Sequence, residues 1–344
     1  MRLRLDPWAA EYNTAYQADE AESSFLGELD AFIETKTWQG ISPDPERAAL
    51  VDGRYESMLF VDGSRRVEAR VLLEDDNRQL AFGAIGSYAI GIVSCCPKQE
   101  RKAEFLDFDH YGQVKRACIL SGGHRIDDFE IRESLQKHLG SLRYEIVETE
   151  ERDVDAVLRR LQFRMLETER EVCSSLTDFF PHSLILSDGP RPSVKTSTPN
   201  IVGYLKTIHD LKFGPDNAEI LEIIRHLEEG QRSPLYYVKE KHNSRYFFEC
   251  FLRLRDPRPW LYSLAGMVRL QFEASTRPKE DIERVQQLAD WLTLKLPLFA
   301  SRQHQDPRAP QQLLPIRALE SELRRRMGSA PIIRRRITSY LSQN

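Results

Sequence analysis

Residues 57–71 read SMLFVDGSRRVEARV, and this stretch decides the fold class. The run MLFV is continuously apolar, as in a strand buried on both faces, whereas RRVEARV alternates strictly and predicts a half-exposed strand. The dipeptide Asp62-Gly63 stands between them and leaves two interpretations open. Asp-Gly between strands is a strong hairpin-turn signal, and taken alone it favours the turn. A carboxylate at the carboxyl end of a buried strand is also where a metal ligand would lie.

Strand-like and helix-like segments are interspersed along the rest of the chain. Apolar or alternating runs predict further strands at residues 87–95, 116–120, 183–190, 200–208, 235–240, 245–254 and 260–272. Helical spacing predicts helices at residues 8–37, 125–140, 152–178, 278–297 and 315–327. We therefore expect an α/β fold, a mixed sheet core with flanking and inserted helices rather than a doubly wound parallel sheet. Residues 1–50 are expected to form an N-terminal helical segment, and residues 51–344 one domain with a basic C-terminal helical part.

Composition places the chain among globular proteins. It has 344 residues, of which 41% are hydrophobic and 30% charged. The N-terminal stretch has no apolar core typical of a secretory signal, and no run is long enough to span a bilayer, so we expect a cytoplasmic protein. Five cysteines without CxxC spacing argue against a disulfide framework and a structural zinc site, and are interpreted as core residues.

Two further carboxylates extend the pattern at Asp62. Asp188 in SLILSDGP also follows an apolar run and precedes a glycine. In the helix expected at 152–178, Glu169 falls in the middle of the apolar face, where a lone carboxylate needs a partner. A metal ion shared with Asp62 and Asp188 would provide one, although a partly exposed helix would also explain Glu169. Glu167 and Glu171 point the opposite way, towards solvent, and Asp52-Gly53 is assigned no chemistry.

In this order, FVDGSRR, LRRLQFRMLETERE, LILSDGP, NIVGYLKTI and the late DPRAPQQLLPIRALESELRRRMG resemble the motifs of the NurA nucleases, over about residues 57–336. The resemblance implies an RNase H-like core, a homodimer, and nuclease activity on single-stranded DNA and duplex ends, supported by manganese or magnesium. It also implies a hexameric HerA-type ATPase as partner in processing DNA ends at double-strand breaks. The sequence has no P-loop, which agrees with an external ATPase.

The resemblance carries catalytic and metal-binding roles onto Asp62, Glu169 and Asp188. A fourth ligand is expected in the late motif, where His304 and Asp306 are the candidates. With these residues we expect two-metal hydrolysis of phosphodiesters, Asp62 bridging both ions. Lys206 could neutralise a phosphate oxygen, although a lysine at a strand end is as often a solubilising edge residue.

DNA binding is expected at the locally basic C-terminus, despite the net charge of −4. The arginines concerned are Arg324, Arg325, Arg326, Arg334, Arg335 and Arg336. A solvated helix face is the alternative explanation for them. The apolar N-terminal positions Phe25, Leu29 and Phe32 are candidates for docking the ATPase, or for packing on the core. Two other functions stay open: a non-catalytic adaptor that binds DNA ends or a translocase, and an RNase H-like nuclease acting on RNA or hybrids.

Overall fold

The protein is described here by a computed structural model that covers residues 2–5, 28–35, 37–74, 80–95, 103–126, 129–131, 141–194, 197–206, 218–240, 245–256, 264–302 and 309–343. The strands are β1 (Arg2–Leu5), β2 (Glu28–Ile33), β3 (Ser57–Glu74), β4 (Leu80–Cys95), β5 (Ala103–Phe105), β6 (Gln113–Ser121), β7 (Phe129–Ile131), β8 (Leu142–Thr149), β9 (Ser183–Asp188), β10 (Ile201–Leu205), β11 (Tyr236–Lys239), β12 (Tyr246–Arg253) and β13 (Met267–Ala274). The helices are α2 (Pro45–Ala49), α3 (Phe108–Tyr111), α4 (Val154–Phe179), α5 (Ala218–His226), α6 (Pro278–Lys295), α7 (Leu314–Arg326) and α8 (Ala330–Gln343), with a 3-10 turn at Leu296–Phe299.

The described strands form one mixed sheet in the order β2-β11-β12-β13-β10-β9-β3-β4-β6-β8-β7, with β1 also pairing with β3 and β5 with β4. β3, β4 and β6 are antiparallel neighbours. On the other side of β3, strands β9 and β10 are added in parallel. The α/β class and the mixed sheet predicted from the sequence are therefore confirmed.

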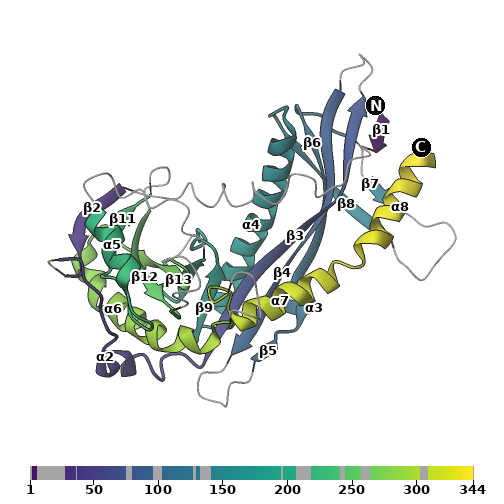
Figure 1. Cartoon of the computed structure of the whole chain (residues 1–344). Helices are drawn as coiled ribbons and strands as arrows, with labels where there is room; N and C mark the ends of the chain where they lie inside the picture. Colours follow the sequence, from purple (N-terminus) through teal and green to yellow (C-terminus); the bar gives the residue numbers. More distant parts are fainter. Residues whose placement is uncertain are drawn as a thin grey trace.

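Helices cover both faces of the sheet around β3 and β4. The apolar face of α4 packs with Val61 and Ile90 in one core cluster. α6 and α7 pack with Phe60 and Ala89 in another. Because adjacent residues of a strand point to opposite faces, these clusters lie on opposite sides of the sheet. β3 and β4 continue beyond them as a long arm, against which α8 packs (Figure 1).

The two ends of α4 explain why it is the longest described helix. Asp153 caps its start by accepting a hydrogen bond from the Ala156 amide at 2.6 Å. The helix then runs to Phe179, close to the predicted 152–178. No helix that the structure describes is long and apolar enough to cross a membrane.

Three sequence predictions are wrong in part. Residues 28–33, expected within a helix, form β2 and pair with β11, so the apolar residues there serve a strand. Phe32 packs on the core, its ring 5.9 Å from that of Phe248, as the packing alternative required. Residues 6–27, with Phe25, lie outside the described residues. Within the expected helix 125–140, residues 129–131 form β7, which pairs with the unpredicted β8.

The third error concerns Asp62-Gly63, which taken alone favoured a turn between two strands. β3 is a single strand of 18 residues that runs straight through the dipeptide. The irregularity in its pairing with β4 comes later, between Val67 and Ala69, and Glu68 is buried there instead of exposed. Asp62 therefore lies in the middle of a long strand.

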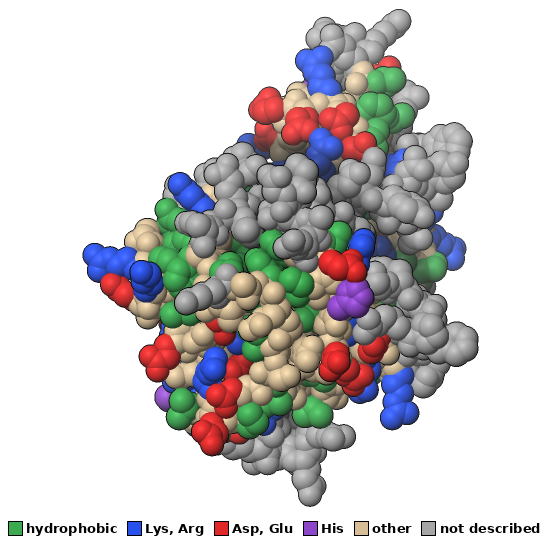
Figure 2. Space-filling view, turned by 60° about the vertical axis from the view of Figure 1, so that its left-hand side comes forward, with side chains coloured by type: hydrophobic (Ala, Val, Ile, Leu, Met, Phe, Trp, Pro, Cys, Tyr) green, Lys and Arg blue, Asp and Glu red, His purple; other side chains and the backbone are tan. Residues whose placement is uncertain are grey.

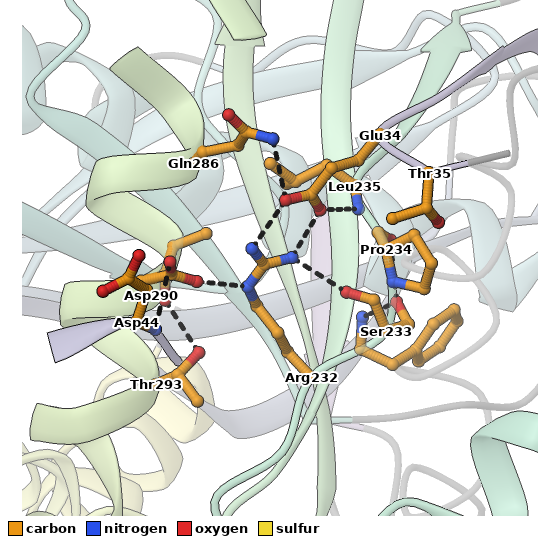
Figure 3. Close-up of polar contacts among 12 residues, drawn as sticks. Glu34, Thr35, Asp44, Arg232, Ser233, Pro234, Leu235, Gln286, Asp290 and Thr293 are labelled. Atoms are coloured by element: carbon orange, nitrogen blue, oxygen red, sulfur yellow. Dashed lines mark hydrogen bonds and ion pairs between the residues drawn. The ribbon is translucent and has the colours of Figure 1, made fainter. Parts of the chain in front are cut away.

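A buried ion-pair network joins the segment after β2 to α6 and to the segment before β11. Arg232, fully buried, donates from Nη1 and Nη2 to the Glu34 carboxylate at 2.6 and 2.8 Å, and from Nε to Asp290 Oδ1 at 2.8 Å (Figure 3). Glu34 follows β2 and also accepts from the Leu235 amide and from Gln286. Asp290 lies on α6, so one arginine joins three segments distant in sequence.

The cysteines behave as expected of core residues. Four of the five are described, and all four are free and buried. They are Cys95, Cys118, Cys173 and Cys250. The remaining one, Cys96, lies outside the described residues.

Candidate metal centre

Asp62 and Asp188 meet because β3 and β9 are parallel neighbours. Their register pairs Val61 with Ser187, so the next residue of each strand is an aspartate at the same level of the sheet. β9 ends at Asp188, and Gly189 then turns the chain with a φ of 121°, a conformation that favours glycine. The two carboxylates predicted to converge thus lie side by side.

A third carboxylate comes from α7. One oxygen from each of Asp62, Asp188 and Glu320 lies within 4.8 Å of the other two. α7 approaches the sheet closely because Gly91, opposite Asp62 on β4, has no side chain: a Cβ there would lie 2.8 Å from Leu323. Glu320 was missed by the sequence reasoning, which sought the fourth ligand earlier in the same motif.

Glu169 is buried as predicted, but it approaches from the other face. Its Oε1 accepts a hydrogen bond from Ser187 Oγ at 2.7 Å. Ser187 precedes Asp188, so the two side chains project to opposite sides of β9. Gly63 gives α4 the room it needs, since a Cβ there would lie 3.1 Å from Met165 and 3.3 Å from Glu169 Oε2. Glu169 is therefore a neighbour of the cluster, and is not among the three converging oxygens.

The neighbours of Glu169 on α4 do not replace it. Glu167 pairs with Arg164 at 2.8 Å, and Glu171 is exposed, 3.9 Å from Lys115. Both lie away from the cluster, which agrees with their predicted orientation.

The electrostatics of the cluster centre on Asp62. Its side chain is only 6% exposed, and its Oδ2 accepts no hydrogen bond from any described residue. Burial, followed by the negative charge of Asp188, raises the pKa of Asp62 well above its usual range, while Lys206 opposes the shift. A buried carboxylate with an unpartnered oxygen, beside two others, is the arrangement that a bound cation would stabilise.

Lys206, which follows β10, lies inside this cluster. Its Nζ is 2.5 Å from Asp188 Oδ2, 2.5 Å from Gln312 Oε1 and 4.0 Å from Glu320 Oε1. Gln312 is fully buried and donates from Nε2 to Glu320 Oε1 at 2.9 Å. Burial alone would lower the pKa of Lys206, but Asp188 and Asp62 outweigh it and the pKa is raised, so the ammonium stays charged. Lys206 is thus no solubilising edge residue.

The structure bears differently on the expected fourth ligands and on the C-terminal arginines. His304 and Asp306 lie outside the described residues. Arg325 and Arg326 are bonded to Glu322 at 2.6 to 2.8 Å, which offsets part of their charge, and Arg336 is buried, so it is not available to phosphates. Three arginines remain outside these contacts: Arg324, Arg334 and Arg335, of which the first and last are exposed.

The surface offers little further guidance to a DNA path. On the face shown in Figure 2, the Lys and Arg side chains of the described residues are scattered, and several Asp and Glu side chains lie together near the top. Such a face lacks the basic stripe that neutralises a phosphate backbone.

Comparison with known proteins adds no relative. No family model matches the chain, and a search of curated proteins gives no match. The function must therefore be argued from the cluster itself.

Proposed function

We propose that the protein is a metal-dependent DNA nuclease, whose ion is held by Asp62, Asp188 and Glu320. The observation that carries the proposal is the buried, unpartnered Asp62 Oδ2 within a group of three converging carboxylates. A carboxylate is rarely buried without a compensating charge, because desolvation penalises its ionised form.

The donor set fits magnesium or manganese. All three candidate ligands are carboxylate oxygens, which hard divalent cations prefer, and the described cluster contributes no cysteine or histidine. A cation bound there supplies Lewis-acid chemistry, lowering the pKa of a water and offsetting charge on a phosphate. The fold is compatible with an RNase H-like core, since a β3-β4-β6 meander is extended by the parallel strands β9 and β10.

The chain's own residues then have distinct tasks. Asp62 and Asp188 are fixed by paired strands, so their oxygens are positioned before any ligand arrives. Glu169 holds the end of β9 through Ser187. Lys206 places a positive charge among the carboxylates, where a phosphate approaching Glu320 would meet it.

The substrate and partners belong to the same proposal. The NurA resemblance supports single-stranded DNA and DNA ends as substrates, a homodimer, and a HerA-type ATPase that drives the DNA. In this proposal the exposed arginines of α7 and α8 contact phosphates without reading bases.

The test compares two Asp-Gly dipeptides. Purified protein with Mn²⁺ should degrade single-stranded DNA, and Asp62→Asn should lower the rate at least about a hundredfold, or roughly 2.7 kcal/mol of barrier. Asp52→Asn is the matched control: Asp52 also precedes a glycine, but it accepts from Trp291 at 2.8 Å and lies outside the cluster. Its activity should match that of the wild type.

The outcomes separate the alternatives. Faster cleavage of an RNA–DNA hybrid than of matched DNA would favour the RNase H-like ribonuclease. Protein that binds DNA ends but cleaves nothing with Mn²⁺ or Mg²⁺, or that cleaves equally well after Asp62→Asn, would favour the adaptor.

A further inference from the structure

Lys206 occupies a position within the carboxylate cluster rather than beside it. Its ammonium bonds Asp188 Oδ2 and lies 4.0 Å from Glu320 Oε1, so it approaches two of the three candidate ligands. Its side chain is 12% exposed. The amine of Lys206 therefore stands where a cation would contact these carboxylates.

The charges of the cluster match one divalent ion. Its three carboxylates carry three negative charges when ionised, and the ammonium of Lys206 offsets one of them. Two negative charges remain among these four residues, which one Mn²⁺ or Mg²⁺ balances; Glu169 is left out of this count because it lies on the other face of the sheet. A second divalent ion would leave the site with excess positive charge, which is costly because its side chains are at most 15% exposed and solvent screens them only in part.

Two carboxylate oxygens of the cluster already have donors. Asp188 Oδ2 accepts from Lys206, and Glu320 Oε1 accepts from Gln312 at 2.9 Å. Gln312 is fully buried, and its Oε1 accepts from the same lysine at 2.5 Å. The ammonium is thus held from two sides. Asp62 Oδ2, by contrast, has no partner among the described residues.

We propose that Lys206 takes the place of a second metal ion, so that the site binds a single divalent cation, centred on Asp62. This inference rests on the proposed function and replaces the two ions expected from the sequence by one. Lys206 then supplies, as a fixed charge, the neutralisation of the phosphate that a second ion provides in two-metal sites.

The experiment counts ions without DNA. Mn²⁺ is titrated into the full chain, and free Mn²⁺ is measured by its electron paramagnetic resonance signal. The wild type should bind one ion per chain at this site. Lys206→Met removes the charge but keeps the length of the side chain, and should bind two ions. Lys206→Arg keeps the charge and should bind one.

A second lysine–aspartate pair provides the control. Lys295 lies 3.4 Å from Asp52 Oδ1, and neither residue belongs to the cluster, so Lys295→Met should leave the count at one. Circular dichroism checks that each variant is folded. Cleavage provides a further readout: Lys206→Met should lose at least about tenfold in rate, equal to 1.4 kcal/mol, even though it binds more ions.

The outcomes are distinguishable. Two ions in the wild type would overturn the role of Lys206 and leave the metal site intact, and this count does not depend on any variant folding. One ion in folded Lys206→Met, bound no more tightly than in the wild type, would also overturn it. No ion bound by the wild type would overturn the proposed function, and this inference with it.

Discussion

Replacing Arg232 by methionine tests how the buried ion-pair network stabilises the fold. The substitution removes three charged hydrogen bonds and leaves the Glu34 and Asp290 carboxylates, 4% and 1% exposed, without their main partner. Breaking a buried pair in this way costs about 3–5 kcal/mol, because the remaining charge stays desolvated. Arg47 lies 3.8 Å from Glu34 and 3.4 Å from Asp290, but it is one-third exposed, so it compensates only in part. We expect Arg232→Met to lower the free energy of unfolding by about 3–5 kcal/mol in total. The costs of leaving Glu34 and Asp290 without their partner should not simply add.

The effect should depend on pH in a defined direction. Burial alone would raise the pKa of Glu34, but the bonds from Arg232 and the Leu235 amide outweigh it, and the pKa lies below its ordinary 4.5. Glu34 therefore stabilises the wild type above that pH, and this stability is lost as the pH falls through the lowered value. In Arg232→Met, burial without the arginine raises the pKa instead. The difference in free energy of unfolding between the wild type and Arg232→Met should therefore become smaller as the pH falls from about 7 to about 4.

Urea unfolding at several pH values measures both effects. Neutralising the stranded groups, by adding Glu34→Gln and Asp290→Asn to Arg232→Met, should recover most of the loss. Arg277→Met is the control, since Arg277 pairs with Glu280 at 3.1 Å on the surface and should cost less than about 1 kcal/mol. The predicted role of Arg232 would be wrong if Arg232→Met lowered the free energy of unfolding no more than Arg277→Met does. It would also be wrong if the difference in free energy of unfolding between the wild type and Arg232→Met became larger at acidic pH.

Three further substitutions test the packing behind the site. Gly203→Ala should lower the free energy of unfolding by about 1–3 kcal/mol and displace the loop after β9, because the new Cβ would lie 2.4 Å from the backbone nitrogen of Arg191. An unchanged urea midpoint would contradict this. Gly63→Ala meets a flexible methionine of α4 instead, so it should lose less stability in the same assay than Gly203→Ala while still lowering Mn²⁺ affinity. Tyr144→Phe removes the 2.9 Å bond to buried Glu68 and should cost about 1.5–3 kcal/mol in urea unfolding; an effect below 0.5 kcal/mol would show the bond is dispensable.

Most strands of the sheet can be predicted from the sequence, but the uninterrupted length of β3 cannot. Alternation and apolar runs predict strands where pairing later places them, because both signals are local. The Asp62-Gly63 dipeptide misleads for the same reason. Its turn preference is overridden by β4, which pairs with β3 from Met58–Cys95 to Glu74–Leu80 and holds the dipeptide extended. The helical spacing at residues 28–33 misleads similarly, since pairing with β11 decides the outcome.

Local sequence patterns also predict part of the candidate site. Asp62 and Asp188 are predictable because each ends an apolar run, and parallel pairing then brings them together. Glu169 is predictable from helix periodicity, and it is buried as that argument requires. Glu320, which the sequence analysis missed, could have been found from the same helix periodicity. It lies four residues after Ile316 and three before Leu323, both buried, and so borders the apolar face of α7.

Periodicity thus points to two glutamates beside apolar helix faces, buried Glu169 and half-buried Glu320, but cannot rank them. Which one reaches the aspartates depends on the face of the sheet that its helix covers. Gly91 admits α7 on the face of Asp62, whereas Gly63 admits α4 on the other. A glycine adjacent to a candidate ligand, on its own strand or opposite it, shows that a helix can come close there. It does not show which helix, because that choice is made by long-range packing.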